Sequence, residues 1–225
     1  MGAGVAVRPS FEGSDRTIVR PLPVLAVRWR DTISLGEGGL SVTGHLKNFR
    51  FGGGVSIDAG RKDHSSGGIF ESGDDRLRGL GTIKASPALR VFASQRVGFV
   101  NFEASAAKSL NRGIMASLGL SSALPLGKKL ILMPHVRADW ADGKQMQAYF
   151  GVTPAQASAS IFRVFTAHGG FKDLRAGANL IYSVNKHWFI GANVDATRLM
   201  GDAAASPISF RDTNVSVLAM AGYRF

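Results

Sequence analysis

The stretch Thr213–Phe225, TNVSVLAMAGYRF, decides the fold class of this chain. From Val215 onward every second residue is apolar or aromatic, whereas the intervening residues are polar, small or mixed. This period of two is typical of a β-strand with one face in an apolar environment. Tyr223 and Phe225 lie on the apolar face, so the strand is predicted to continue through the last residue.

The same period recurs along the chain and predicts a single all-β domain of antiparallel strands over residues 1–225. About twelve strands are expected. The third and fourth are the weakest, because Ile33–Leu46 could form one bulged strand around Gly36–Gly39, which leaves a ten-strand alternative. The predicted ranges are 3–11, 19–30, 32–37, 39–47, 49–61, 80–94, 97–108, 112–124, 128–140, 171–184, 187–199 and 213–225.

The predicted connections alternate between short and long. Transmembrane β-barrels have this asymmetry, with short periplasmic turns at one end and long extracellular loops at the other. The tight links are expected at Asp31, Lys47–Asn48, Gln95–Arg96, Gly127–Lys128 and Asn185–Lys186, and the longer ones at 12–17, 62–78, 141–170 and 202–212.

A soluble β-sandwich would also alternate, so strand length and aromatic residues must separate the two classes. The predicted strands exceed the ~5–6 residues usual in soluble sheets and suit the ~9–11 residues of a tilted bilayer span. Aromatic residues near the strand ends on the apolar face would form the girdles of a membrane barrel. They are Trp29, Trp140, Tyr182, Trp188, Tyr223 and Phe225.

Composition limits the chemistry. The chain has no cysteine, which excludes disulfides and thiolate metal sites. The formal net charge of +11 admits nucleic acid, anionic lipid or an anionic solute as partner, but the basic residues are spread over many strands, which argues against nucleic acid. The five histidines lack metal-ligand spacing and no Gly-x-Ser-x-Gly elbow occurs, so no catalytic, cofactor-binding or metal site is predicted.

Charged residues on the other strand face are predicted to point into the lumen of the barrel. They could form a ladder of ion pairs that fills the lumen, which is the favoured interpretation, or line a narrow anion-preferring pore. The predicted lumen residues are Arg8, Arg28, Arg50, Asp58, Lys84, Arg90, Glu103, Arg137, Asp139, Arg175, Asp195 and Arg224.

The long connection Ala141–Gly170 is too apolar for a solvated loop. It is expected to fold into the barrel mouth as a lid, or else to dock a partner. The residues that carry this prediction are Met146, Tyr149, Phe150, Val152, Phe162 and Phe165.

The chain resembles the MipA/OmpV family of Gram-negative outer-membrane proteins, the family of the MltA-interacting protein, nearly from end to end. The most specific match is Tyr149–Ser158, YFGVTPAQAS. The other matching stretches are Gly2–Val5, Glu12–Asp15, Pro21–Pro23, Leu77–Gly81, Arg198–Ala203, Ser206–Ile208 and Tyr223–Phe225.

The resemblance implies a barrel in the outer membrane, here in its mature form without a signal peptide, in contact with lipid and lipopolysaccharide. It implies that Tyr223 and Phe225 act as the signal for the barrel-assembly machinery. Some family members look like scaffolds that join a lytic transglycosylase to a murein synthase. We therefore expect a non-catalytic scaffold for peptidoglycan enzymes, with a small anion-preferring channel and an adhesin acting through the outer loops as alternatives.

Overall fold

The computed structural model describes residues 1–30, 32–36, 39–65, 68 and 71–225. Within these residues the protein is one antiparallel sheet of fourteen strands with three short α-helices, which confirms the all-β antiparallel prediction. The strands are β1 (Gly2–Pro9), β2 (Thr17–Val24), β3 (Val27–Trp29), β4 (Ile33–Gly36), β5 (Gly39–Leu46), β6 (Phe49–Asp58), β7 (Ser86–Val97), β8 (Val100–Ser109), β9 (Ile114–Ser122), β10 (Leu124–Pro125), β11 (Leu130–Ala141), β12 (Gly170–Ser183), β13 (Trp188–Leu199) and β14 (Thr213–Tyr223). The helices are α1 (Gly143–Phe150), α2 (Pro154–Ala159) and α3 (Gly201–Ala205), with a 3-10 turn at Asp75–Leu77.

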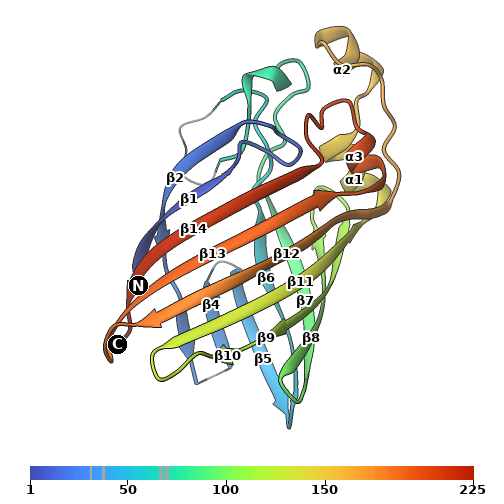
Figure 1. Cartoon of the computed structure of the whole chain (residues 1–225). Coiled ribbons are helices and arrows are strands. Elements are labelled where there is room, and N and C mark those ends of the chain that lie inside the picture. Colours follow the sequence, from blue (N-terminus) through green and yellow to red (C-terminus); the bar gives the residue numbers. More distant parts are fainter. Residues whose placement is uncertain (31, 37–38, 66–67, 69–70) are drawn as a thin grey trace.

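The sheet curls round on itself (Figure 1). Its hydrogen-bonded order runs β2-β1-β14-β13-β12-β11-β9-β8-β7-β6-β5-β4-β3, with β10 paired to β11 beside this path. The two ends of the path, β2 and β3, are consecutive in sequence and separated only by Leu25 and Ala26. The sheet therefore begins and ends on one stretch of chain, Thr17–Trp29.

The curled wall carries its large apolar side chains on the outside. In the β13–β14 ladder, Val194 lies opposite Val217, and both are exposed, as are Trp188 and Val215. The alternation seen in the sequence thus separates an apolar outer face from an inner face of charged, polar and small residues. None of the helices in the described parts of the chain is long and apolar enough to cross a membrane.

Two of the twelve predicted strands are each divided in the structure, which gives fourteen. The predicted strand 19–30 is broken at Leu25–Ala26 because its first half pairs with β1 and its second half with β4. The predicted strand 112–124 becomes β9 and β10, which pair with β11 in one continuous register. Pro134 of β11 interrupts that ladder, since proline has no N–H to donate.

The predicted strands 32–37 and 39–47 are two separate strands, because Gly36 of β4 lies opposite Gly39 of β5, so the alternative of one bulged strand is wrong. Two further boundaries were also wrong. The predicted turn at Gln95–Arg96 is at Gly98–Phe99, where Gly98 takes a positive φ of 61°. The predicted strand 80–94 starts at Ser86, because Gly79 and Gly81 have φ near +90° and +80° and turn the chain away. The tight link predicted at Asp31, and Glu37 and Gly38 within the predicted bulge, lie outside the described residues.

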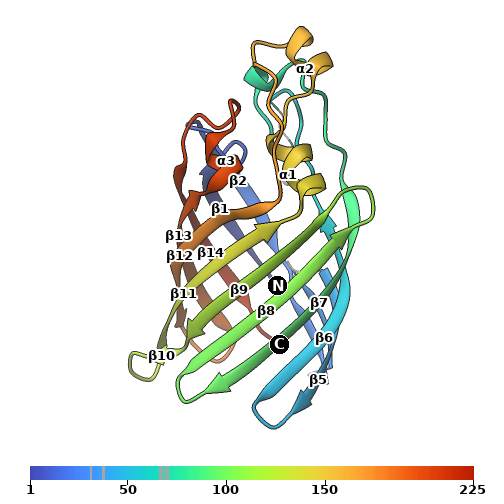
Figure 2. The ribbon, with the colours of Figure 1, turned by 90° about the vertical axis from the view of Figure 1, so that its right-hand side faces the viewer.

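The long connections gather at one end of the sheet, whereas most of the short ones lie at the other (Figure 2). Four connections make the crowded end: residues 10–16, 59–85, 142–169 and 200–212. Their described parts are called the cap below. The N-terminus is held away from the cap, because the Met1 ammonium donates to the Tyr223 carbonyl at 2.8 Å.

Candidate functional site

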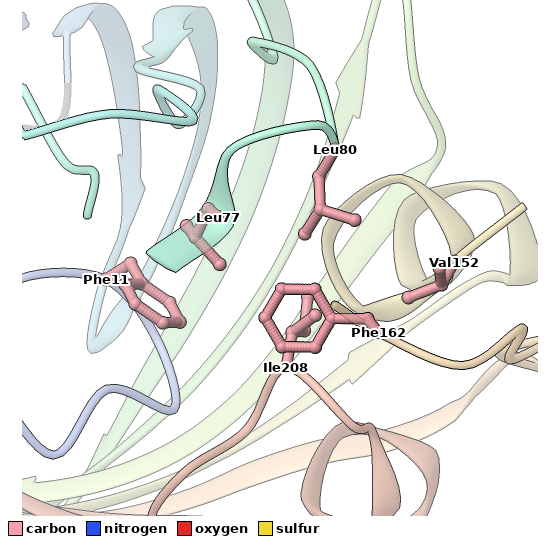
Figure 3. Packing of buried hydrophobic residues seen from close by; sticks show 6 residues of the cluster. All are labelled: Phe11, Leu77, Leu80, Val152, Phe162 and Ile208. Atoms are coloured by element: carbon pink, nitrogen blue, oxygen red, sulfur yellow. The ribbon is translucent and has the colours of Figure 1, made fainter. Parts of the chain in front are cut away.

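The cap has a hydrophobic core of its own. One cluster joins residues from all four connections (Figure 3) and consists of Phe11, Leu77, Leu80, Val152, Phe162 and Ile208. A second cluster seats α1 and α3 on the ends of β11 and β13 and consists of Ala141, Met146, Phe150, Ala167, Leu199 and Ala203. The cap is therefore a packed layer over one end of the sheet.

The six residues of the predicted lid all lie in or against these clusters. Met146 and Phe150 are buried in the second, and Val152 and Phe162 in the first. Tyr149 is partly buried against the second, whereas Phe165 packs against both. The apolar character of this connection thus corresponds to side chains that pack inside the cap.

Local signals stop the connection between β11 and β12 from continuing as strand. Asp142 caps α1 by accepting a hydrogen bond from the Gln145 N–H at 2.9 Å. Thr153 and Gln156 form a capping box at α2, with Pro154 in the first turn. The Gln156 amide then donates to the Leu80 carbonyl at 2.5 Å, which ties α2 to the connection between β6 and β7.

Charged residues join the cap connections to each other. Asp74 is buried and accepts from Arg76 through both carboxylate oxygens, at 3.1 and 2.9 Å. Arg76 also pairs with Asp15 at 2.7 Å, and its guanidinium lies 4.0 Å from the centre of the Phe210 ring. Burial alone would raise the pKa of Asp74, but the hydrogen bonds from Arg76 outweigh burial and leave that pKa below its ordinary value.

A second group of charges joins the cap to the wall. Lys172 lies between Glu12 of the cap, at 2.6 Å, and Asp173 of its own strand, at 3.0 Å. Arg112, which follows β8, pairs with Asp58 of β6 at 2.8 Å. The Tyr149 hydroxyl donates to Asp58 as well. Burial and this hydrogen bond to a carboxylate raise the pKa of the Tyr149 phenol.

A β-bulge explains why Lys172 and Asp173 are both buried although they are adjacent. The register between β11 and β12 shifts between Asp139 and Trp140, so that Asp139 lies opposite Asp173 while Trp140 lies opposite Phe171. An extra residue in one strand changes which face its side chains occupy. Lys172 and Asp173 are 5% and 1% exposed, whereas Phe171 is 60% exposed.

Below the cap, charged and polar side chains line a series of cavities. A cavity of about 700 Å³ near the short-link end and one of about 210 Å³ above it share Arg50, Glu103 and Arg137 as lining residues. Arg90 lines the smaller of these and also a cavity of about 430 Å³ beside Arg28. A further cavity of about 340 Å³ lies directly beneath the cap, two residues closer to it along β8 and β9 than the cavity of about 210 Å³. Arg8 and Asp58 are among its lining residues.

Some predicted lumen charges are paired across the inner wall. Arg137 donates to the fully buried Asp139 at 2.8 Å. His135 of β11 hydrogen-bonds Asp195 of β13 at 2.7 Å, although β12 lies between these strands. Gly177 occupies the intervening position, and a Cβ there would lie only 2.3 Å from an Asp195 oxygen, so the absent side chain makes room for the pair.

Three predicted lumen residues have other surroundings. Arg175 lies opposite Arg137 in the ladder, and its buried Nε has no hydrogen-bond partner among the described residues. Lys84 is exposed in the segment before β7 and lies outside the strands. Arg224 lies beyond the end of β14, where it donates to the Ser183 hydroxyl at 3.0 Å.

The sequence did not single out Arg61, Arg112 or Lys172, because each reaches its place through tertiary structure. Arg61 follows β6 and is held by two backbone hydrogen bonds to Ile83. Arg112 lies in the turn after β8, and Lys172 is turned inward by the bulge. Within the described ranges no three His, Cys, Asp or Glu side chains are grouped as a metal ion would need.

An antiparallel sheet curled round a polar lumen, apolar outside and capped at one end, is the architecture of outer-membrane β-barrel proteins. The family described as "MltA-interacting protein MipA" matches residues 1–225, and the chain belongs to this family. No curated protein matches the sequence. Among solved structures, the KdgM porin in complex with disordered oligogalacturonate is similar, with a TM-score of 0.50 and 6% identity over 100% of this chain and 99% of that one. The NanC porin has a TM-score of 0.41 and 9% identity over 99% of this chain and 100% of that one.

Proposed function

We propose that this protein is a closed barrel of the outer membrane that acts without catalysis, as a scaffold for enzymes of peptidoglycan synthesis and hydrolysis. The observation that carries this proposal is the match of the whole chain to a family described by its interaction with MltA. A lytic transglycosylase and a murein synthase are the proposed partners.

The topology supports closure of the barrel. Both ends of the sheet belong to Thr17–Trp29, so a single strand with a break at Leu25–Ala26 can serve as the last strand on both sides. Closure removes exposed sheet edges, which a hydrocarbon environment does not tolerate.

The two ends of the barrel suit different tasks. The cap occupies the end with the long connections, which faces outward in barrels of this class. The short links would then face the periplasm, where murein enzymes act. Several of these links carry basic residues, namely Lys47, Lys128, Lys129 and Lys186, which would attract an acidic partner surface.

A binding measurement with charge-reversal variants tests the scaffold. The purified barrel is immobilised in detergent, and a purified lytic transglycosylase is titrated over it, alone and with a murein synthase. We expect the double variant Lys128→Glu/Lys129→Glu to weaken binding about tenfold or more, because opposite charges become like charges across the contact. Lys144→Glu provides the control, because Lys144 is exposed on α1 in the cap at the other end. If the barrel captures neither enzyme, or if both variants bind like the parent protein, the proposal of a scaffold is wrong.

The lining of the lumen favours a second function, a small channel that prefers anions. Arg50, Arg90 and Arg137 line the successive cavities of the lower lumen, with Glu103 as the nearby carboxylate. Single-channel recordings in a planar bilayer would test this function. Neutral residues at Arg90 and Arg137 should shift the reversal potential towards cations. An unchanged reversal potential, or a bilayer that stays silent after verified insertion, would exclude the channel.

A further inference from the structure

The cavity of about 340 Å³ beneath the cap has an unusual balance of charge. Three cations line it, Arg8 from β1, Arg61 from the connection after β6, and Lys172 from β12. Two carboxylates line it as well, Glu12 and Asp58. Each carboxylate already has a cationic partner, since Glu12 binds Lys172 at 2.6 Å and Asp58 binds Arg112 at 2.8 Å.

The two arginines have no carboxylate partner among the residues that the structure describes. Arg61 donates through Nη1 to the Tyr149 carbonyl at 2.7 Å, and Arg8 donates through Nη2 to the Glu71 carbonyl at 3.3 Å. Arg61 is only 6% exposed. Burial without sufficient compensation lowers the pKa of its guanidinium to about 10.

Buried hydrogen-bond donors without a partner also occur among the residues that line this cavity. The Nε atoms of Arg8 and Arg61 and the hydroxyl of Ser109 are buried and have no hydrogen-bond partner within the described residues. All three residues line the same cavity. Buried donors are nearly always satisfied in folded proteins, so three in one cavity indicate the position of a ligand that accepts hydrogen bonds.

The backbone holds Arg61 in this position. Gly60 has a φ of 73°, and a Cβ there would lie 2.0 Å from the Ile83 carbonyl oxygen, so this turn requires glycine. Arg61 then exchanges two hydrogen bonds with Ile83, at 2.9 and 2.7 Å. Because Arg61 Nη1 also donates to the Tyr149 carbonyl, the guanidinium is positioned before any ligand binds, which reduces the entropic cost of binding.

We propose that this cavity is a binding site for the phosphate or carboxylate group of a small soluble anion, held between Arg8 and Arg61 with Ser109 as a third donor. A guanidinium matches the planar geometry of two oxygens on such a group. The site lies directly beneath the cap and between the wall strands that line it, which favours a free solute over the headgroup of a membrane lipid. The inference goes beyond the scaffold and the channel, and binding requires neither a protein partner nor conduction.

Titration calorimetry with inorganic phosphate tests the site on the folded full-length barrel in detergent, in a buffer without other oxyanions. We expect one phosphate per barrel. We expect Arg61→Gln and Arg8→Gln to weaken binding at least about tenfold, because each removes a charged hydrogen-bond donor. Arg163→Gln is the matched control, since Arg163 is exposed in the cap and does not line the cavity.

Thermal unfolding separates loss of the site from loss of folding. Without phosphate, Arg61→Gln should unfold at the same or a higher temperature than the parent protein, because it removes a buried cation that lacks a carboxylate. With phosphate, only the parent protein and Arg163→Gln should gain stability through binding. The proposal is overturned if the parent protein does not bind phosphate, or if all variants bind it equally. Displacement of phosphate by phosphatidylglycerol micelles would assign the site to a lipid headgroup and would overturn the proposal that the ligand is a small soluble anion.

Discussion

The cap and the wall use the same residue types in opposite ways. Ile208 in the cap is fully buried, whereas Ile57 in β6 is 75% exposed, and Leu77 and Leu118 differ in the same manner. In the cap, apolar side chains leave water by packing against each other, as in a soluble protein. On the wall they point outward, which is stable only if lipid replaces water there. The comparison shows that the surroundings of each region, and not the hydrophobicity of its residues, determine which side chains are inside.

The largest loss of stability is expected when a side chain is removed from the apolar core of the cap. Leu77→Ala should destabilise the cap by about 4 kcal/mol, because it leaves a cavity among Phe11, Phe162 and Ile208. Hydrogen exchange of the cap segments would measure the loss. Leu118→Ala removes the same atoms from the outer wall and should leave exchange in the cap unchanged. Equal loss of protection in both variants would mean that the cap and the wall unfold as one unit.

The next largest loss of stability is expected from the ion pairs of the cap. Asp74→Asn should destabilise the cap by about 3 kcal/mol, because Arg76 then loses its buried carboxylate partner. The pKa of Asp74 lies below its ordinary value in the folded protein, so its contribution is present above the unfolded value of about 3.9 and is lost as the pH falls through the folded value. Asp15 and Asp75 are shifted in the same direction, so the variant should reduce the acid sensitivity without removing it.

Pepsin cleavage of the cap across the acid range checks this prediction. The parent protein should become sensitive to cleavage as the pH falls, whereas Asp74→Asn should be more sensitive already at the upper end of the range. If Asp74→Asn and the parent protein share one pH profile, this ion pair does not stabilise the cap.

The third prediction concerns the close contact between two cap connections. Gly79 has a φ of 89°, and Gly79→Ala places a Cβ 2.0 Å from the Ala159 carbonyl oxygen. We therefore expect α2 to move and the cap to lose about 2 kcal/mol of stability. Gly81→Ala is a matched control with a φ of 78° and nothing within 4 Å of the new Cβ, so only backbone strain of about 1 kcal/mol remains. Trypsin cleavage after the exposed Arg163 measures both. Equal cleavage rates would show that this contact does not hold α2 in place.

The sequence predicted the wall better than the cap, for a physical reason. Each wall strand shows its environment in its own alternation, so β14 and β13 could be recognised without knowledge of their neighbours. The cap helices have only 5 to 8 residues, too few for a helical period to be visible. The cap core also joins residues from four connections, among them Phe11 and Ile208, so no local pattern could reveal it.

Among the charged residues of the lumen, only those on regular strands could be placed from the sequence. Arg137 and Asp139 lie on the alternating face of one strand, so their inward position followed from the period of two. Lys172 could not be placed, because the bulge that turns it inward depends on the register with β11. Arg61 lies beyond the strand, where alternation carries no information.

The smallest effect is expected in the wall, at Gly177. Gly177→Ala would place a Cβ 2.3 Å from an Asp195 oxygen and 3.0 Å from the His135 ring, which separates the pair and costs about 1 kcal/mol. Both partners are only partly buried, and water in the lumen can replace the lost hydrogen bond. The shift in heat-induced unfolding on a semi-native gel should therefore be small, with hydrogen exchange in the cap unchanged. A loss of cap protection would show that the lumen network and the cap are coupled, and that the two regions are less independent than their opposite patterns of burial indicate.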